Sequence, residues 1–417
     1  PNANEFFFQC DQADIPWEAA LDAQGAGFIE ASSPRLKYRK LFCWGTHQGG
    51  RHWQEFLAVP GMDYLEIQAG LAPTQLHHLP FAAGEDWHWT EFFGYLQADP
   101  AQVHDPNYAA AWQAVDAVLK QRISAADMAQ IEQRCLARSG VHSAQILQQG
   151  SGWGALEVER LTRAGRAEQM PAAFSFPIAS LGPEQTRWLP VLDGQGLAEQ
   201  PPDKIPGEWL VQHPWREHLE ASLEQPENRN WYALLHYGVM LAEEFVYEKA
   251  AAAWRESIDQ KPSAWAYRNL AALDQANDRT EDALANFRQA WKIAADCAMP
   301  VEALAYEYLS ALVKAGKYSE ARDLYRSLPA EAADSDRVQI LWAMTALKLD
   351  ELNAVEQVLK RNFATVREGQ VDLTNLWFEM WQRREAQCSG KSPDEITLAE
   401  IKAKHPAPPA IDFRSVE

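Results

Sequence analysis

The chain has 417 residues, of which 47% are hydrophobic and 23% are charged, a balance typical of folded globular proteins. Its formal net charge of −20 disfavours a nucleic-acid partner or an anionic membrane surface, because an acidic protein repels phosphate groups. No apolar run is long enough to cross a membrane, and a chain of this length is expected to form two or three domains.

Five cysteines are spread along the chain without a Cys-x-x-Cys pair. They are Cys10, Cys43, Cys135, Cys297 and Cys388. Their odd number and wide spacing indicate a reducing cytoplasm and argue against a disulfide framework or a zinc site. We therefore expect a cytoplasmic protein that needs no metal or other cofactor.

Short aromatic and β-branched runs, separated by Gly, Pro and Asp, dominate the first 98 residues and predict strands. The predicted strands cover residues 5–10, 27–31, 40–45, 64–68 and 87–96. In the fourth of them Tyr64, Glu66 and Gln68 alternate with Leu65 and Ile67. Because alternate residues of a strand share a face, a ring, a carboxylate and an amide would lie together. A solvated edge strand is the alternative interpretation of this pattern.

Helical spacing of Ala, Leu, Glu and Arg replaces this pattern after residue 98. Residues 107–121 and 124–139 predict a helical hairpin, with Ser124 and Asp127 as an N-terminal cap and Gly140 as a C-terminal cap. A further short helix is predicted at 155–165. The glycines at 150–154 follow no strand and lack a Gly-Lys-Ser/Thr ending, so a phosphate-binding loop is not expected. The rest of this segment, to residue 228, is predicted to be an irregular connector.

A repeat begins near residue 230. A small residue followed four positions later by an aromatic or Val recurs at Ala250, Ala283, Ala321 and Ala354, in steps of 33, 38 and 33 residues. A paired helix precedes each of these positions, with Tyr237-Gly238, Leu270-Ala271, Tyr308-Leu309 and Leu341-Trp342 at corresponding places. This pattern over 230–363 resembles the tetratricopeptide repeat family, in which stacked antiparallel helix pairs form an α-solenoid. Residues 372–384 are predicted to be a capping helix, and a polar tail follows from residue 389.

The first 97 residues contain several segments that resemble the C-terminal part of the aldose 1-epimerase (galactose mutarotase) superfamily. They are Trp17–Asp22, Lys40–Gly45, Gly49–Leu57, Tyr64–Gln68 and the run from Leu79 to Phe93 with Pro80, Gly84, Glu85 and Glu91. More closely, they are similar to a bacterial branch in which this β-sandwich is fused to tetratricopeptide repeats. The resemblance implies a partial β-supersandwich that binds a sugar or oligosaccharide.

The same resemblance implies that Glu66 is the catalytic base for proton transfer at an anomeric centre. General acid–base chemistry of this kind needs a second group, a His in the family, and no metal. The family's His lies upstream of the Glu strand, in sequence that this chain lacks. We therefore expect a second polypeptide, or a missing N-terminal half, to complete the sandwich. His47, His52, His77 and His78 are the candidates within the chain to replace that acid.

Further residues are expected to bind the substrate, and most of them have an alternative role. Trp44 and Trp53 stack on a sugar ring or belong to the core, and Gln68 and Gln75 bind hydroxyls or cap turns. Arg51 binds an anionic group or pairs with Glu55. Gln54 and Glu55 complete the predicted substrate-binding set. If Glu55 and Glu66 lay on neighbouring strands, they could instead be the carboxylate pair of a glycoside hydrolase.

The sequence therefore predicts an α+β multidomain protein. Residues 1–98 form the mutarotase-like portion, 99–228 the helical and irregular connector, 229–388 the α-solenoid with its capping helix, and 389–417 the polar tail. The leading hypothesis is sugar binding with proton transfer, joined to repeats whose groove holds a protein partner. The rivals are a non-catalytic sugar-binding or protein-interaction scaffold and the glycoside hydrolase.

Overall fold

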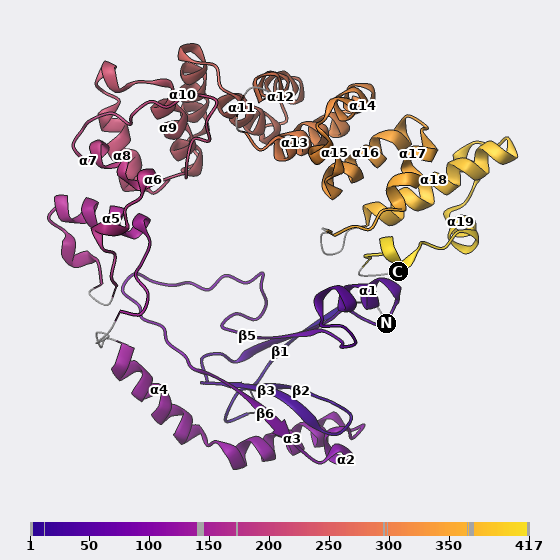
Figure 1. Cartoon of the computed structure of the whole chain (residues 1–417). Helices are drawn as coiled ribbons and strands as arrows, with labels where there is room; N and C mark the ends of the chain where they lie inside the picture. The colour runs from indigo at the N-terminus through magenta and orange to yellow at the C-terminus, as the bar shows by residue number, and fades with distance from the viewer. Residues whose placement is uncertain are drawn as a thin grey trace. The chain divides into compact units, whose positions relative to one another are not determined.

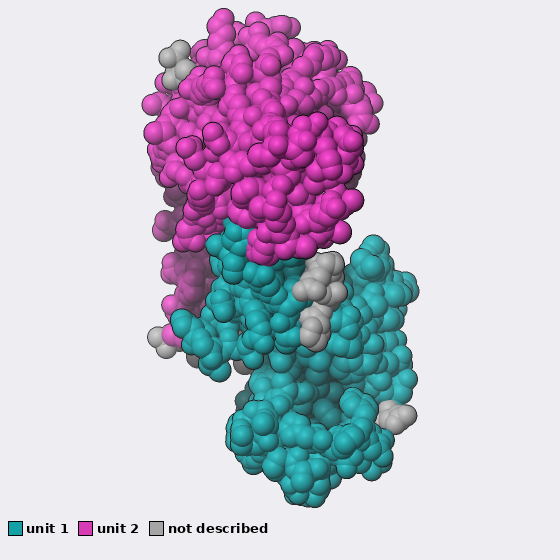
Figure 2. All heavy atoms as spheres, turned by 90° about the vertical axis from the view of Figure 1, so that its right-hand side faces the viewer, with its two compact units in different colours: residues 1–141, 368–371, 408–417 teal, residues 142–367, 372–407 magenta. Residues whose placement is uncertain are grey.

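The structure is a computed structural model of the whole chain (Figure 1), and it describes residues 3–11, 13–139, 146–171, 174–294, 297, 299–364, 366 and 371–414. The predicted cap Gly140 lies outside the described residues. The chain divides into two compact units, shown in different colours in Figure 2. The first comprises residues 1–141, 368–371 and 408–417, and the second comprises residues 142–367 and 372–407.

The first unit contains two antiparallel sheets of three strands each, with the strand orders β1-β4-β5 and β2-β3-β6. The strands are β1 (Asn4–Gln9), β2 (Trp17–Leu21), β3 (Ala26–Ser32), β4 (Tyr38–Cys43), β5 (Leu65–Gly70) and β6 (Glu91–Gln97). The prediction that short strands dominate the first 98 residues is confirmed. The last predicted strand begins later than expected, at Glu91 rather than at residue 87.

Helices cover one face of the β2-β3-β6 sheet. They are α2 (Pro100–Val103), α3 (Tyr108–Arg122) and α4 (Ala125–Ser139), so both predicted helices are confirmed. The predicted hairpin is wrong, because α3 and α4 do not pack side by side and α4 runs away from the end of α3 (Figure 1). Ile29 and Leu96 of the sheet pack against Val115 and Leu119 of α3 and Met128 of α4, and all five are nearly inaccessible. Burial of these apolar side chains is the main contribution that holds the helices on the sheet.

Residues 48–57, for which no regular element was predicted, form helix α1 (Gln48–Leu57). His47 caps the helix, since its side chain accepts a hydrogen bond from the Gly50 backbone N–H. The two glycines there allow close backbone packing. A Cβ on Gly49 would lie 2.4 Å from the carbonyl oxygen of Arg414, and one on Gly50 would lie 2.2 Å from that of Trp44. The short 3-10 helix η5 (Pro409–Ile411) precedes Arg414 and packs near α1.

The second unit is helical throughout its regular elements. They are α5 (Gly152–Arg163), η1 (Ala167–Gln169), η2 (Ile178–Ser180), α6 (Pro183–Thr186), α7 (Leu189–Leu192), α8 (His213–Ser222), η3 (Pro226–Asn228), α9 (Trp231–Glu243), α10 (Tyr247–Gln260), α11 (Ala264–Ala276), α12 (Thr280–Ala294), α13 (Val301–Lys314), α14 (Tyr318–Ser327), α15 (Ala330–Asp334), α16 (Asp336–Lys348), α17 (Leu352–Leu359), α18 (Asp372–Ser389), η4 (Pro393–Glu395) and α19 (Leu398–Lys404). Helices α9 to α17 form four antiparallel pairs, with α15 inserted before the last pair. This confirms the predicted helical repeats.

The turn inside each pair has one residue in the left-handed conformation, namely Phe245, Asp278, Gly316 and Asp350. The residue after each of these donates its backbone N–H to the carbonyl five positions earlier, as Val246 does to Leu241. This is the Schellman ending of a helix. Counting from these turn residues aligns the repeats. Val355, and not the predicted Ala354, is equivalent to Ala321, and the equivalent residues on the first helix of the fourth pair are 342–343 rather than 341–342. The fourth repeat was therefore misplaced by one residue.

Close packing within the first pair depends on Gly238 of α9. A Cβ at this position would lie 2.3 Å from the indole nitrogen of Trp254 on α10. Trp254 and Ala250 are both buried, and the indole N–H of Trp254 donates to the carbonyl of Leu235. The small-plus-aromatic pattern therefore describes contacts between the two helices of a pair, as the repeat argument required.

Candidate functional site

The polar face of β5 carries a short chain of hydrogen bonds. The Tyr64 hydroxyl lies 3.3 Å from Glu66 Oε1 and donates to it, and Gln68 Nε2 donates to Glu66 Oε2 at 3.0 Å. All three side chains are partly buried. The predicted grouping of a ring, a carboxylate and an amide on one face is therefore present in the structure.

Two more side chains extend this chain of hydrogen bonds across the sheet. Gln75 Nε2 donates to Gln68 Oε1 at 3.1 Å, and the Lys40 ammonium donates to Gln75 Oε1 at 3.1 Å. Lys40 is buried and also pairs with Glu5 on β1 at 3.0 Å. Antiparallel pairing places Lys40 directly opposite Gln68, so both project from the same face of the sheet.

A cavity of about 370 Å³ opens beside these residues, within the size range of ligand pockets. Gln68 and Gln75 line it together with His77, Trp89 and Glu91. Amide, imidazole and carboxylate groups there can donate and accept hydrogen bonds, and an indole can cover an apolar face. The set matches the needs of a ligand with several hydroxyl groups.

Trp89 and Glu91 precede and begin β6, and we had not assigned either to the site. The Trp89 side chain is 41% exposed, and its indole N–H donates to Glu91 Oε1 at 3.2 Å. Alternation of an aromatic and a carboxylate at positions 89 and 91, the same pattern that drew attention to 64 and 66, was the signal that could have identified them.

A buried cluster of charges lies between the two sheets and next to this cavity. Arg39, which also lines the cavity, places its Nε 2.7 Å from Glu30 Oε2, without the alignment of a hydrogen bond. Its other guanidinium nitrogens donate to Ser32 Oγ and to the carbonyls of Leu36, Tyr38 and Pro16. Glu18 stands directly opposite Glu30 in the pairing of β2 with β3. Glu30 therefore forms an ion pair with Arg39 in the interior, while Glu18 is attracted by the charge of Arg39 without contacting it.

Both carboxylates are held in a state that favours the proton. Burial raises the pKa of Glu18 to about 8 against the attraction of Arg39, and repulsion by Glu30 adds to the increase. Burial likewise raises the pKa of Glu30 to about 7, and Glu91 at the cavity adds to the increase. Glu18 near the start of β2 and Glu30 within β3, each flanked by apolar residues, were the signs of this cluster in the sequence.

The two predicted stacking residues, Trp44 and Trp53, are 2% and 3% exposed and belong to the core. Their rings stack on each other with centroids 5.3 Å apart, and Trp53 also packs against Phe413 near the C-terminus. The Trp53 indole N–H donates to the Phe413 carbonyl at 2.8 Å. Trp44 and Trp53 therefore have the core role, which was the alternative to stacking on a sugar ring.

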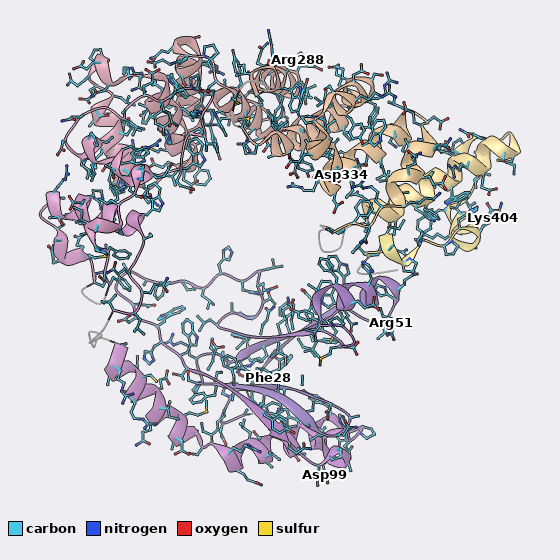
Figure 3. The ribbon with its side chains drawn as sticks, in the orientation of Figure 1. Phe28, Arg51, Asp99, Arg288, Asp334 and Lys404 are labelled. Atoms are coloured by element: carbon cyan, nitrogen blue, oxygen red, sulfur yellow. The ribbon has the colours of Figure 1, made fainter. Side chains whose placement is uncertain are left out.

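Arg51, Gln54 and Glu55 lie on helix α1, where Figure 3 labels Arg51. Arg51 donates to the Thr46 carbonyl, and Gln54 donates to that of Gly45. None of the three lines the cavity described above. The premise that Glu55 and Glu66 occupy neighbouring strands is wrong, because Glu55 is helical.

Of the four candidate histidines, His77 lines the cavity, and its Nδ1 lies 2.8 Å from Thr74 Oγ1. His47 caps α1, and His52 packs edge-on against Phe413. Burial lowers the pKa of His52. His78 is exposed. Within the described ranges, no group of three or more His, Cys, Asp or Glu side chains is placed to hold a metal ion.

Comparison with known proteins gives a fold and no family. No family model matches the sequence, and no curated protein matches it. A solved structure of a TPR-domain-containing protein from Parabacteroides distasonis is similar, with 17% identity and a TM-score of 0.52. The match covers all of this chain and 60% of that protein, so the chain spans less than two thirds of its neighbour's length. The chain shares the fold of that TPR-domain protein.

The tetratricopeptide-like repeats are joined to one another by ion pairs between their helices. Arg268 of α11 donates to Glu307 of α13 through two of its guanidinium nitrogens, and Arg288 of α12 pairs with Glu320 of α14 at 3.1 Å. In addition, none of the helices described is both long and apolar enough to span a membrane.

Proposed function

We propose that this protein binds a carbohydrate in the cavity between β5 and β6 and holds a polypeptide partner on its tetratricopeptide-like repeats. The observation that carries the first part is the convergence of Gln68, Gln75, His77 and Glu91 with the exposed ring of Trp89 around one cavity. The similarity of residues 1–97 to the mutarotase family is consistent with a sugar as the ligand.

We propose in addition that the site moves a proton at the anomeric carbon. Glu66, the base implied by the resemblance, does not itself line the cavity, but it accepts a hydrogen bond from Gln68, which does. His77 lines the same cavity and is suited to the acid role, because an imidazole exchanges protons near neutral pH. In this scheme Glu66 takes the proton of the anomeric hydroxyl while His77 protonates the ring oxygen, and the bond between C1 and the ring oxygen breaks to give the open-chain aldehyde. After rotation about the C1–C2 bond, the reverse proton transfers close the ring on the other face of the carbonyl.

One NMR experiment tests binding and chemistry together. Free aldoses mixed with the full chain should show broadened signals from binding and exchange cross-peaks between anomers from proton transfer. Trp89→Ala should weaken binding at least tenfold, about 1.4 kcal/mol, and Glu66→Gln should remove the exchange while broadening persists. Trp209→Ala, a partly exposed tryptophan of the second unit, is the matched control.

The outcomes of this experiment separate the hypotheses. Broadening without exchange in the unmodified protein would leave a non-catalytic sugar-binding scaffold. Absence of broadening with every aldose and oligosaccharide tested would contradict the carbohydrate proposal itself. The position of Glu55 on helix α1, and not on a strand beside Glu66, argues against a glycoside hydrolase that uses these two carboxylates.

We also propose that a further polypeptide segment completes the two sheets. β1 is an edge strand in which every residue is exposed, including Phe6, Phe7 and Phe8. On the other sheet Phe28, labelled in Figure 3, stacks on Phe93 although both rings are exposed. Edge strands with apolar side chains are templates for an added strand.

Hydrogen–deuterium exchange tests in one experiment the two surfaces proposed to bind a polypeptide, namely the edge strand β1 and the repeats. In the isolated chain, alternate amides of β1 should exchange within seconds, because only β4 pairs with this strand. A co-purified partner that completes the sheet should slow them, and one that binds the repeats should slow α9–α17 instead. Full protection of β1 in the isolated chain would contradict the completing-strand proposal.

A further inference from the structure

A second cavity, of about 440 Å³, lies in the second unit among helix α5, the loop at 208–212 and the start of α8. Three indole side chains line it, Trp153, Trp209 and Trp215, together with the carboxylates of Glu157 and Glu208. This cavity is separate from the one lined by Trp89, and the proposed carbohydrate chemistry makes no use of it.

The walls of the cavity are held in place by other contacts. Trp215 is buried, donates its indole N–H to Glu157 Oε2 at 3.1 Å and packs edge-on against Trp188. Trp209 is 39% exposed, and its ring lies 4.8 Å from that of the buried His236. Rings fixed before binding lose little conformational freedom when a ligand enters.

The charge of the cavity is one-sided. Arg160 donates to both carboxylate oxygens of Glu157, at 2.9 and 2.6 Å, so that pair is balanced. Glu208 makes no ion pair with any residue that the structure describes. Its backbone N–H is hydrogen-bonded to Glu184, and its side chain is exposed. Glu208 is therefore the carboxylate beside the three indoles that has no ion-pair partner among the described residues, whereas Arg166 as well as Arg160 attracts Glu157.

We propose that this cavity binds quaternary ammonium compounds. Tryptophan is the best aromatic partner for a cation over its face, and several rings around one cation add their attractions. A methylated ammonium is weakly hydrated, so it enters an aromatic site at a lower desolvation cost than a primary ammonium does. The carboxylate of Glu208 supplies the opposite charge, and the net charge of −20 favours the approach of cations.

The test measures the binding of choline to the full chain by calorimetry. Two further ligands serve as comparisons. The neutral counterpart of choline, 3,3-dimethylbutan-1-ol, has the same shape without the charge, and trimethylglycine adds a carboxylate that Glu208 repels. We expect choline to bind at least tenfold more tightly than either of them. Trp209→Ala should weaken choline binding about tenfold, and Glu208→Gln should weaken it several-fold.

Matched controls exclude indirect effects. Trp89→Ala and Glu217→Gln change an exposed tryptophan and an exposed glutamate outside the cavity, and both should leave choline binding unchanged. Equal binding of the neutral alcohol would show an apolar pocket and overturn the proposal. So would an undetectable interaction with choline at millimolar concentration, or equal losses in Trp209→Ala and Trp89→Ala. Unchanged helical circular dichroism of the variants establishes that they fold.

Discussion

Replacement of Arg39 with methionine should cost about 3–5 kcal/mol of stability in the first unit at pH 8.5, because it leaves two buried carboxylates without their common cation. Glu18 and Glu30 face each other across β2 and β3, and Arg39 is the cation that contacts Glu30. Like charges opposite each other in a sheet are destabilising, and burial strengthens the effect.

The loss should depend on pH in a defined direction. Burial raises the pKa of Glu18 to about 8 and that of Glu30 to about 7, both above the ordinary carboxylate value. The folded state therefore binds more protons than the unfolded state, so this contribution to stability decreases as pH rises from about 4.5 to 8. At pH 5 both groups are protonated, and Arg39→Met should be much less harmful.

Urea unfolding at pH 5 and pH 8.5, with hydrogen exchange of β3 as the local probe, measures this difference. Arg51→Met, which removes an exposed arginine of the same unit, is the control and should cost less than about 1 kcal/mol. Glu18→Gln should increase stability at pH 8.5. Equal losses in Arg39→Met at the two pH values would contradict the role assigned to the carboxylates.

Truncation of a single side chain near the C-terminus should loosen helix α1. Phe413 is 2% exposed, packs against Trp53 and His52, and accepts the Trp53 indole N–H through its carbonyl. Removal of a buried phenylalanine ring typically costs about 3–5 kcal/mol. We expect Phe413→Ala to release residues 408–414 and to expose Trp53.

Hydrogen exchange of α1 and proteolysis at the C-terminal segment report this change. Phe6→Ala, which truncates a phenylalanine that is already 47% exposed, should change neither. Gly49→Ala should reproduce the effect, because a Cβ there would collide with the Arg414 carbonyl. Normal protection of α1 in Phe413→Ala would show that the segment is not part of the first unit's core.

The features that could be predicted from the sequence are those that depend on residues close together along the chain. Alternation identified the polar face of Tyr64, Glu66 and Gln68, and the small-plus-aromatic spacing identified the helix pairs. The shift in the fourth repeat arose because Val355, and not a small residue, occupies the position that Ala321 has in the third.

Features that depend on distant residues could not be predicted in this way. Helix α1 was not predicted, and Trp53 on this helix is hydrogen-bonded to Phe413, which is 360 residues away along the chain. The tertiary fold likewise places Arg39 beside the carboxylates of β2 and β3 in the other sheet. It also brings Trp89 and Glu91 to the cavity.

The proposed carbohydrate site requires that a sugar binds against Trp89. Fluorine NMR of the protein labelled with 5-fluorotryptophan tests it most directly, with the Trp89 signal assigned from a Trp89→Phe variant. Titration with a panel of aldoses and oligosaccharides should shift the Trp89 signal saturably for at least one sugar and leave that of Trp209 in place. A Trp89 signal that no sugar in the panel moves would contradict the account.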